Sequence, residues 1–117
     1  MGKLSLFLVE DEALIRKMMA EMVEELGHQI VAEAGSVREG LPLAETVEFD
    51  LALLDVNLGG ESVAPIAITI ERRGLPFLIV TGYASTSLPE PFSGRPVLRK
   101  PFPTASLKQA IDNRLKT

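Results

Sequence analysis

The chain of 117 residues is long enough for one domain with a single hydrophobic core, so residues 1–117 are expected to form one domain. Its net charge of -4 leaves no excess of basic side chains for nucleic-acid phosphates, and we expect no nucleic-acid partner. The absence of cysteine excludes disulfides, thiolate metal ligands and thiol catalysis. No apolar run has the length of a signal peptide or a membrane span, so we expect a cytoplasmic protein with no membrane partner.

The first part of the chain predicts a strand, a helix and a second strand. Residues 4–9 form a short apolar run, and residues 12–26 place apolar side chains on one stripe of a helix that Gly27 would end. The methionines of this stripe are expected to pack in the core, namely Met18, Met19 and Met22. Residues 30–34 predict the second strand.

The next helix carries mixed signals. Ser36 and Glu39 fit a capping box at its start. Gly40 and Pro42 are unfavourable inside a helix, because glycine is too flexible and proline removes a hydrogen bond. We therefore expect a weak or kinked helix.

The centre of the chain supplies two further strands. Residues 51–54 are a continuous apolar run, typical of a strand buried on both faces. Gly59 and Gly60 predict a turn, and Ser62 is a candidate cap for the helix that follows it. Residues 77–80 predict a fourth strand.

The last part of the chain departs from this alternation. Residues 83–96 contain three prolines and little periodicity, which predicts a loop or at most a short, poorly formed helix. Residues 97–98 predict a fifth strand, and a final helix begins near Thr104. With right-handed crossovers this order predicts an α/β fold, a (βα)5 doubly wound, five-stranded parallel sheet with a weak or absent fourth helix.

Polar side chains follow the predicted strands where each strand ends. Glu10 and Asp11 follow the first strand, Asp55 the third, Thr81 the fourth and Lys100 the fifth. In doubly wound sheets ligands bind at the carboxyl ends of the strands. We therefore expect these side chains to converge on one rim.

Three carboxylates on one rim repel one another unless a cation lies between them. Oxygen ligands favour Mg²⁺; Mn²⁺, or Ca²⁺ in a crystal, could replace it. Lys100 adds a positive charge and Thr81 a hydrogen-bond donor, so the set can offset the charge of a phosphoryl group. Asp55 would then be the nucleophile that forms an acyl phosphate.

Taken singly, these residues have ordinary structural interpretations. Asp55 could form a turn or cap a helix, and Glu10 with Asp11 could simply favour a helix N-terminus. Thr81 could belong to a turn, and Lys100 could mark a strand exit. Their joint occurrence at the ends of different strands favours the functional interpretation.

Other polar residues are expected to be structural. His28 follows a helix end and is predicted to be solvated or capping, not a metal ligand or phosphocarrier. The helix cations, including Arg16 and Arg73, are expected on solvated faces.

The residues quoted so far occur in motifs. Four segments resemble those of response-regulator receiver domains: Leu8-Val9-Glu10-Asp11-Glu12, Leu53-Leu54-Asp55-Val56-Asn57, Val80-Thr81-Gly82-Tyr83 and Lys100-Pro101-Phe102. The resemblance covers essentially the whole chain in order and spacing. It implies a flavodoxin-like fold and a place in two-component phosphorelay signalling.

The resemblance also implies a role for each site residue. Asp55 would accept a phosphoryl group from a sensor histidine kinase, Thr81 would be the switch hydroxyl and Lys100 the phosphate contact. Asp11 would bind the metal directly and Glu10 mostly through water. The implied metal-ligand set is Glu10, Asp11, Asp55 and the backbone carbonyl of Asn57. The chain would signal to a downstream protein target or a phosphotransfer protein, and would catalyse no reaction beyond its own phosphorylation and dephosphorylation.

One position departs from the receiver pattern. Receivers usually carry Tyr or Phe three residues before the lysine, whereas this chain has Val97. Residues 75–83 resemble instead the Pro-Phe-x-x-x-Thr-Gly-Tyr pattern of the "FAT GUY" receivers, whose kinases are often of the HWE type. Because residues 83–96 are rich in Pro, Ser and Gly and Val97 supplies no aromatic switch, we expect phosphorylation to order this segment; the alternative is a plain surface loop. Tyr83 is expected to shield the phosphoryl group from water.

Two other functions use similar residues. A haloacid-dehalogenase-like phosphohydrolase also combines Asp, Thr, Lys and Mg²⁺, but such enzymes have an Asp-x-Asp motif after the first strand, where this chain has Glu10-Asp11-Glu12. A degenerate receiver acting only as an interaction module is the second alternative. The intact set of Asp11, Asp55, Thr81 and Lys100 counts against it.

Overall fold

The computed structural model describes residues 3–82 and 97–115. The elements in chain order are β1 (Ser5–Val9), α1 (Ala13–Glu25), β2 (Gln29–Ala34), α2 (Val37–Thr46), β3 (Leu51–Asp55), β4 (Asn57–Leu58), β5 (Glu61–Ser62), α3 (Ala64–Arg72), β6 (Phe77–Thr81), β7 (Val97–Arg99) and α4 (Thr104–Leu115). Within these ranges the five predicted strands and four helices are present, and two short strands, β4 and β5, follow β3.

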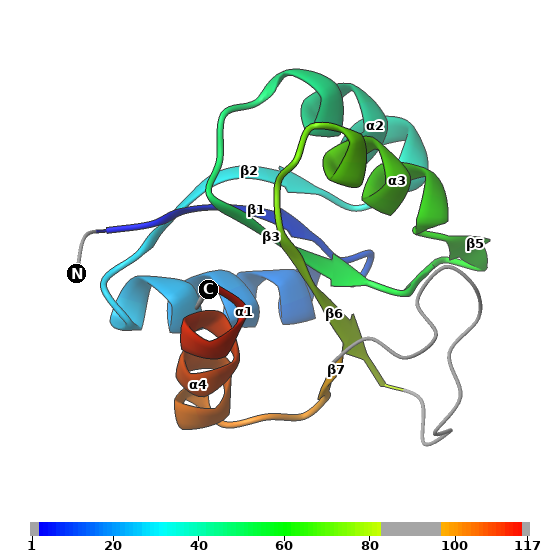
Figure 1. Ribbon diagram of the computed structural model, residues 1–117. Coiled ribbons are helices and arrows are strands. Elements are labelled where there is room, and N and C mark those ends of the chain that lie inside the picture. Colours follow the sequence, from blue (N-terminus) through cyan, green and yellow to red (C-terminus); the bar gives the residue numbers. More distant parts are fainter. Residues whose placement is uncertain (1–2, 83–96, 116–117) are drawn as a thin grey trace.

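The main sheet has five parallel strands in the order β2-β1-β3-β6-β7 (Figure 1). Strands β3 and β6 lie inside it, and every residue of both is buried. Continuous apolar runs are what strands covered on both faces require. The predicted doubly wound, flavodoxin-like sheet is confirmed.

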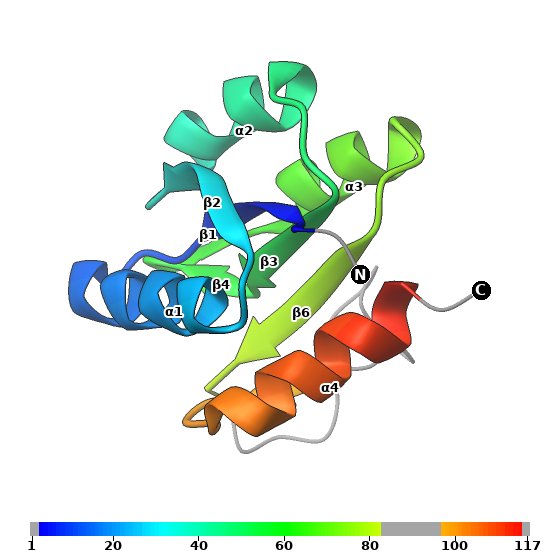
Figure 2. The ribbon, with the colours of Figure 1, turned by 90° about the vertical axis from the view of Figure 1, so that its left-hand side faces the viewer.

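Helices α2 and α3 cover one face of the sheet, and α1 and α4 cover the other (Figures 1 and 2). Because successive side chains of a strand point to opposite faces, each strand feeds two apolar clusters. The cluster on the α2/α3 side includes Phe7, Val9, Ala44, Leu54, Ile66 and Ile70. The cluster on the α1/α4 side includes Leu6, Leu8, Met19, Val23, Leu53, Leu107 and Ile111.

A small hairpin, which the sequence pattern did not predict beyond its turn, follows β3. Strands β4 and β5 pair in antiparallel fashion around Gly59 and Gly60. These glycines have φ values of 59° and 93°, a region that side chains with a Cβ rarely adopt. The predicted turn therefore closes a hairpin beside the carboxyl end of β3.

Helix α2 is continuous through both residues that were expected to weaken it. Ser36 is the N-cap, and its Oγ accepts a hydrogen bond from the amide of Glu39 at 3.1 Å, as predicted. Pro42 lies inside the helix, which continues to Thr46. Gly40 has a packing role, because an added Cβ would lie 2.6 Å from Ile66 Cδ1. The glycine lets α2 approach α3.

Two predictions around α3 are wrong in detail. The N-cap is Val63, while Ser62 Oγ accepts a hydrogen bond from the Ala64 amide at 3.1 Å. Arg73 is not on a solvated face: its Nη1 donates to the carbonyls of Ala44 and Val47 at 2.7 and 2.9 Å. This arginine thereby satisfies carbonyls at the end of α2.

Helix α1 divides its methionines between core and surface. Met19 is buried as expected, whereas Met18 is 51% exposed, so the core prediction is wrong for Met18. Met22 is partly buried against the α1/α4 cluster. His28 Nδ1 accepts a hydrogen bond from the Leu4 amide at 3.1 Å, which gives it a structural role.

The structure describes four helices, of which the last, α4, lies near the C-terminal end. The expected weak or absent helix falls on residues 83–96, outside the described ranges, and so does Tyr83. Within the described ranges no helix is long and apolar enough to cross a membrane.

Candidate phosphoacceptor and metal site

Strand alternation places two carboxylates on the same side of the sheet. Leu6 and Leu8 of β1 face α1 and α4, and Glu10 continues that row. Leu53 of β3 has the same orientation, and Asp55 continues its row. Glu10 is fully buried and Asp55 is 6% exposed, so both charges lie at the edge of an apolar core.

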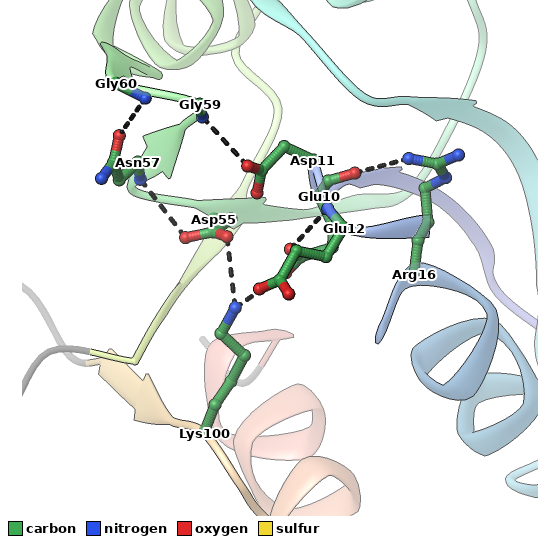
Figure 3. Close-up of polar contacts among 9 residues, drawn as sticks. All are labelled: Glu10, Asp11, Glu12, Arg16, Asp55, Asn57, Gly59, Gly60 and Lys100. Carbon is green, nitrogen blue, oxygen red and sulfur yellow. Dashed lines mark hydrogen bonds and ion pairs between the residues drawn. The ribbon is translucent and has the colours of Figure 1, made fainter. Parts of the chain in front are cut away.

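Lys100 joins these two carboxylates. Its Nζ lies 2.9 Å from Glu10 Oε1 and 3.2 Å from Asp55 Oδ2 (Figure 3). The lysine follows β7, and its amide donates to the carbonyl of Thr81 at 2.8 Å, which extends the pairing of β6 and β7. The fifth strand therefore delivers the ammonium group to the rim.

The electrostatics of the rim follow from burial. Desolvation raises the pKa of Glu10 to about 7, although hydrogen bonds from Lys100 and from the Glu12 amide lower it. For Lys100, burial lowers the pKa, but the bonds and charges of Glu10 and Asp55 outweigh this effect and raise it. The lysine thus stays charged, while Glu10 titrates near neutrality.

The hairpin closes the rim from the other side. The Gly59 amide donates to Asp11 Oδ2 at 3.0 Å, and the Gly60 amide donates to Asn57 Oδ1 at 2.9 Å (Figure 3). The amide of Asn57 donates to Asp55 Oδ1 at 3.3 Å. Asp11, Asp55 and Asn57 are therefore held at one rim, as the sequence predicts.

The acidic residues fit a divalent cation. Glu10, Asp11 and Asp55 each offer a carboxylate oxygen, and these oxygens lie within 4.8 Å of one another. Such an all-oxygen set suits Mg²⁺, which needs one or two protein carboxylates and keeps several waters. The donor chemistry therefore agrees with the predicted metal.

Thr81 occupies the last position of β6, next to β3, and its side chain is buried. In the β3–β6 pairing Asp55 lies opposite Val80, so Thr81 is one residue further along the neighbouring strand. Of the predicted site residues, Glu10, Asp11, Asp55 and Lys100 are in mutual contact or close proximity, and Thr81 is at the adjacent strand end.

Two residues at the site had no signal in the sequence pattern. Gly59 had been expected only to form a turn, and its amide holds Asp11. Arg16, expected on a solvated face, donates from Nη1 to the Glu10 carbonyl at 2.6 Å (Figure 3). Both contacts depend on how separate elements meet, which local periodicity does not encode.

An apolar groove of about 390 Å³ borders the rim. It lies between α1 and the segment that follows β7, and it reaches Lys100. Its lining includes Ile15, Met18, Met19, Met22, Pro101 and Phe102. Leu14, on the same helix, is 72% exposed. The site thus has apolar surface beside it on the α1 side.

A model of the response regulator receiver domain matches residues 6–112. The transcriptional regulatory protein PdtaR of Mycobacterium tuberculosis is 36% identical over 112 residues, which cover 90% of this chain and 53% of PdtaR. The chemotaxis protein CheY-3 of Vibrio cholerae is 25% identical over 93% of this chain and 89% of its own length. The chain spans about half the length of PdtaR and of YvrH from Bacillus subtilis.

Solved structures give the same result. The solution structure of SdrG from Sphingomonas melonis has a TM-score of 0.86 and 36% identity, covering 99% of this chain and 100% of SdrG. The response regulator PhyR from Brucella abortus has a TM-score of 0.81 and 28% identity, covering 97% of this chain and 48% of PhyR. The matched residues include both strand ends that carry the acidic cluster and the strand that delivers Lys100. The chain belongs to the response regulator receiver domain family.

Proposed function

We propose that this receiver domain takes a phosphoryl group from a phosphohistidine of a sensor histidine kinase onto Asp55. The observation that carries the proposal is the contact of Lys100 with Asp55, in a rim where three carboxylate oxygens lie within 4.8 Å. A lone buried aspartate would be a structural residue; one paired with an ammonium in an acidic cluster has the surroundings that phosphoryl transfer requires.

The step is a displacement at phosphorus. A carboxylate oxygen of Asp55 forms the new P–O bond, the P–N bond to the donor imidazole breaks, and the bonding electrons leave with that nitrogen. Lys100, already 3.2 Å from Asp55, neutralises an oxygen of the transferred group. Thr81 donates its hydroxyl to another. A bound Mg²⁺ would supply further charge neutralisation at the same oxygens.

The metal would be held by Asp11 and Asp55 directly, by Glu10 mostly through water, and by the backbone carbonyl of Asn57. Mn²⁺ should serve in place of Mg²⁺, since both accept oxygen ligands. The chain acts as a signalling module, and we propose that the reaction it catalyses is confined to its own aspartyl phosphate.

Partners follow from this role. The phosphodonor is a sensor histidine kinase, and the HWE type remains a prediction that rests on residues 75–83. The phosphorylated domain acts on a downstream protein or a phosphotransfer protein. A solved neighbour from Bartonella quintana is described as the anti-anti-sigma factor PhyR, which supports a protein as the downstream target.

Signal output in this proposal involves Val97, at a position where receivers usually carry Tyr or Phe. Val97 is partly buried against the α2/α3 cluster and pairs with Ile79. Because it is a valine, it has no aromatic ring that could rotate on activation. Ordering of residues 83–96 and shielding by Tyr83 stay predictions, since both fall outside the described ranges. Amide exchange of that segment with and without beryllofluoride tests the first; equal protection in both states would contradict it.

The phosphoacceptor is tested by intact mass after incubation with Mg²⁺ and either acetyl phosphate or phosphoramidate. The unchanged protein should gain one phosphoryl group, and Asp55→Asn should gain none. Asp50→Asn is the matched control, because Asp50 directly precedes the same strand, at the end opposite to Asp55, and is exposed. Loss of the gain in Asp50→Asn but not in Asp55→Asn would assign the acceptor elsewhere.

The phosphohydrolase alternative predicts a different result. Such an enzyme would release phosphate over many turnovers from a phosphomonoester with Mg²⁺, whereas a receiver should release none above background. The family match favours the receiver.

A further inference from the structure

Arg16, in the first turn of α1, makes contacts that a solvated arginine does not need. Its Nη1 donates to the backbone carbonyl of Glu10 at 2.6 Å, and its Nε lies 3.3 Å from Glu33 Oε1 on β2 (Figure 3 shows the first contact). The guanidinium therefore bridges the end of β1 and the neighbouring strand. A planar fork suits this task because it can direct two donors at once.

The backbone of Glu10 is held through both the peptide that precedes it and the peptide that follows it. Its amide donates to the carbonyl of Ala34 at 3.0 Å, which is the last bond between β1 and β2, and its carbonyl accepts from Arg16. The next residue is Asp11, where the chain leaves the sheet for α1. Arg16 therefore fixes the peptide from which both acidic residues of this turn project.

The guanidinium of Arg16 also packs closely against the backbone at Gly35. A Cβ added to Gly35 would lie 2.9 Å from Arg16 Nη1 and 3.7 Å from the Glu10 carbonyl oxygen. An added Cβ would therefore make the end of the Arg16 side chain shift. Its position is thus determined by its two partners and by the backbone beside it.

We infer that Arg16 is a positioning residue for the divalent-cation site: by holding the Glu10 carbonyl it sets the placement of the Glu10 and Asp11 carboxylates. The inference deepens the proposed function, since the cation serves the transfer to Asp55. Arg16 is not one of the residues that would contact the cation or the phosphoryl group in the proposed site.

The direction in which cation affinity changes when Arg16 is replaced separates a positioning role from a purely electrostatic one. A guanidinium near a cation site repels the cation, so removing its charge alone would strengthen cation binding. Removing a group that orients metal ligands weakens binding, typically by about 10–100-fold. The two roles of Arg16 therefore predict opposite changes in the dissociation constant.

The decisive experiment is a Mn²⁺ titration of the metal-free protein, followed by water proton relaxation, with no phosphodonor present. We expect Arg16→Met to raise the dissociation constant by about 10-fold or more. Lys17→Met is the control, because it removes the same charge from the next residue, which is exposed. It should leave the constant unchanged or slightly lower. An Arg16→Met protein that behaves like Lys17→Met would overturn the inference, as would an unchanged protein that binds no Mn²⁺.

Two further variants keep the charge. Arg16→Lys can reach one partner but not both, and we expect it to fall between Arg16→Met and the unchanged protein. Gly35→Ala keeps the arginine and displaces its guanidinium, so it should weaken Mn²⁺ binding in the same direction. If Arg16→Met fails to fold, Gly35→Ala decides the question, and Mn²⁺ affinity equal to that of the unchanged protein would count against positioning.

Amide exchange in the metal-free protein is a second test, and it reports on the turn between β1 and α1. In the metal-free protein, amide exchange at Asp11 and Glu12 should be faster in Arg16→Met, while exchange in the strand interiors should be unchanged. Faster exchange everywhere would indicate a general loss of stability and contradict a positioning role.

The outcome is distinct from that of the proposed function. If the unchanged protein binds Mn²⁺ but Asp55 is never phosphorylated, the proposed function fails and the Arg16 comparison is still decided. If phosphorylation occurs, Arg16→Met should need a higher Mg²⁺ concentration for half-maximal rate, and saturating Mg²⁺ should restore the maximal rate. A lowered maximal rate at saturating Mg²⁺ would contradict the inference.

Discussion

The two sides of the sheet are built differently. On the α2/α3 side a glycine, Gly40, lets the helices approach so closely that no added Cβ would fit beside Ile66. On the α1/α4 side an apolar groove of about 390 Å³ borders Lys100, and Met18 is half exposed. Both sides share the same strands, so the difference lies in the helices.

The carboxylates belong to the more open side. Glu10 and Asp55 continue the rows of β1 and β3 that face α1 and α4. The closed side therefore supplies packing, and the open side carries the carboxylates of the proposed site and the apolar groove next to them. This division predicts that substitutions on the two sides affect different properties.

The largest effect should come from the closed side. Ile66 is fully buried, and Ile66→Ala removes side-chain volume that the packed helices cannot easily refill. We expect the free energy of unfolding to fall by about 2–5 kcal/mol, measured by urea unfolding. Phosphorylation of Asp55 should continue in the fraction that is folded. A loss below about 1 kcal/mol would mean that this side is less tightly packed than its geometry indicates.

The second effect is a pH dependence of the free energy of unfolding that comes from Glu10, on the open side of the sheet. Because burial raises the pKa of Glu10 from 4.5 to about 7, the folded protein holds this proton more tightly than the unfolded chain does. Between these pH values the folded state binds more protons, so stability falls as pH rises, by up to about 3 kcal/mol in the metal-free protein. Urea unfolding at several pH values in EDTA measures the trend.

Glu10→Gln isolates this contribution, because the amide does not titrate. The stability difference between the two proteins should shift toward the variant as pH rises from 4.5 to about 7. A constant difference across this range would show that Glu10 keeps an ordinary pKa in the folded protein.

A smaller effect tests the contact between α2 and α3. Gly40→Ala should gain helix propensity of roughly 1 kcal/mol but lose more through contact with Ile66 Cδ1. Ile66→Val lacks that methyl group, so adding Gly40→Ala to it should cost less than in the unchanged protein. A double-mutant cycle should give a coupling of about 1 kcal/mol. Additive effects would remove the packing explanation for Gly40.

The smallest effect should come from the open side. Met18→Gln changes a half-exposed residue to a good helix former, and we expect a change below about 0.5 kcal/mol in the free energy of unfolding. The matched variant Met19→Gln places an amide in the core and should cost much more. Equal losses in the two variants would show that the groove is as tightly packed as the closed side.

Sequence patterns predicted the parts of the molecule that depend on local order. Apolar runs located the strands, and the residue after each run reached the rim because parallel strands end at the same edge. Asp55 and Lys100 were found in this way, although 45 positions separate them. Their motifs added the roles that geometry alone does not assign.

What the patterns missed depends on contacts between elements. Arg16 looks like any helix cation until β1 and β2 pair and bring the Glu10 carbonyl and Glu33 together. Gly40 looks like a weak point until Ile66 lies against it. Strands β4 and β5 have two residues each, too few to show a period.

The ion pair between Glu10 and Lys100 joins positions 90 residues apart, and β7 is an edge strand of the sheet. While the domain folds, the acidic rim would therefore stay without its ammonium until β7 has paired with β6. The ability to accept phosphate would then depend on the docking of β7, which brings Lys100 to the rim. In the proposed function, a domain in which β7 has not docked would bring no Lys100 to Asp55 and should accept no phosphoryl group.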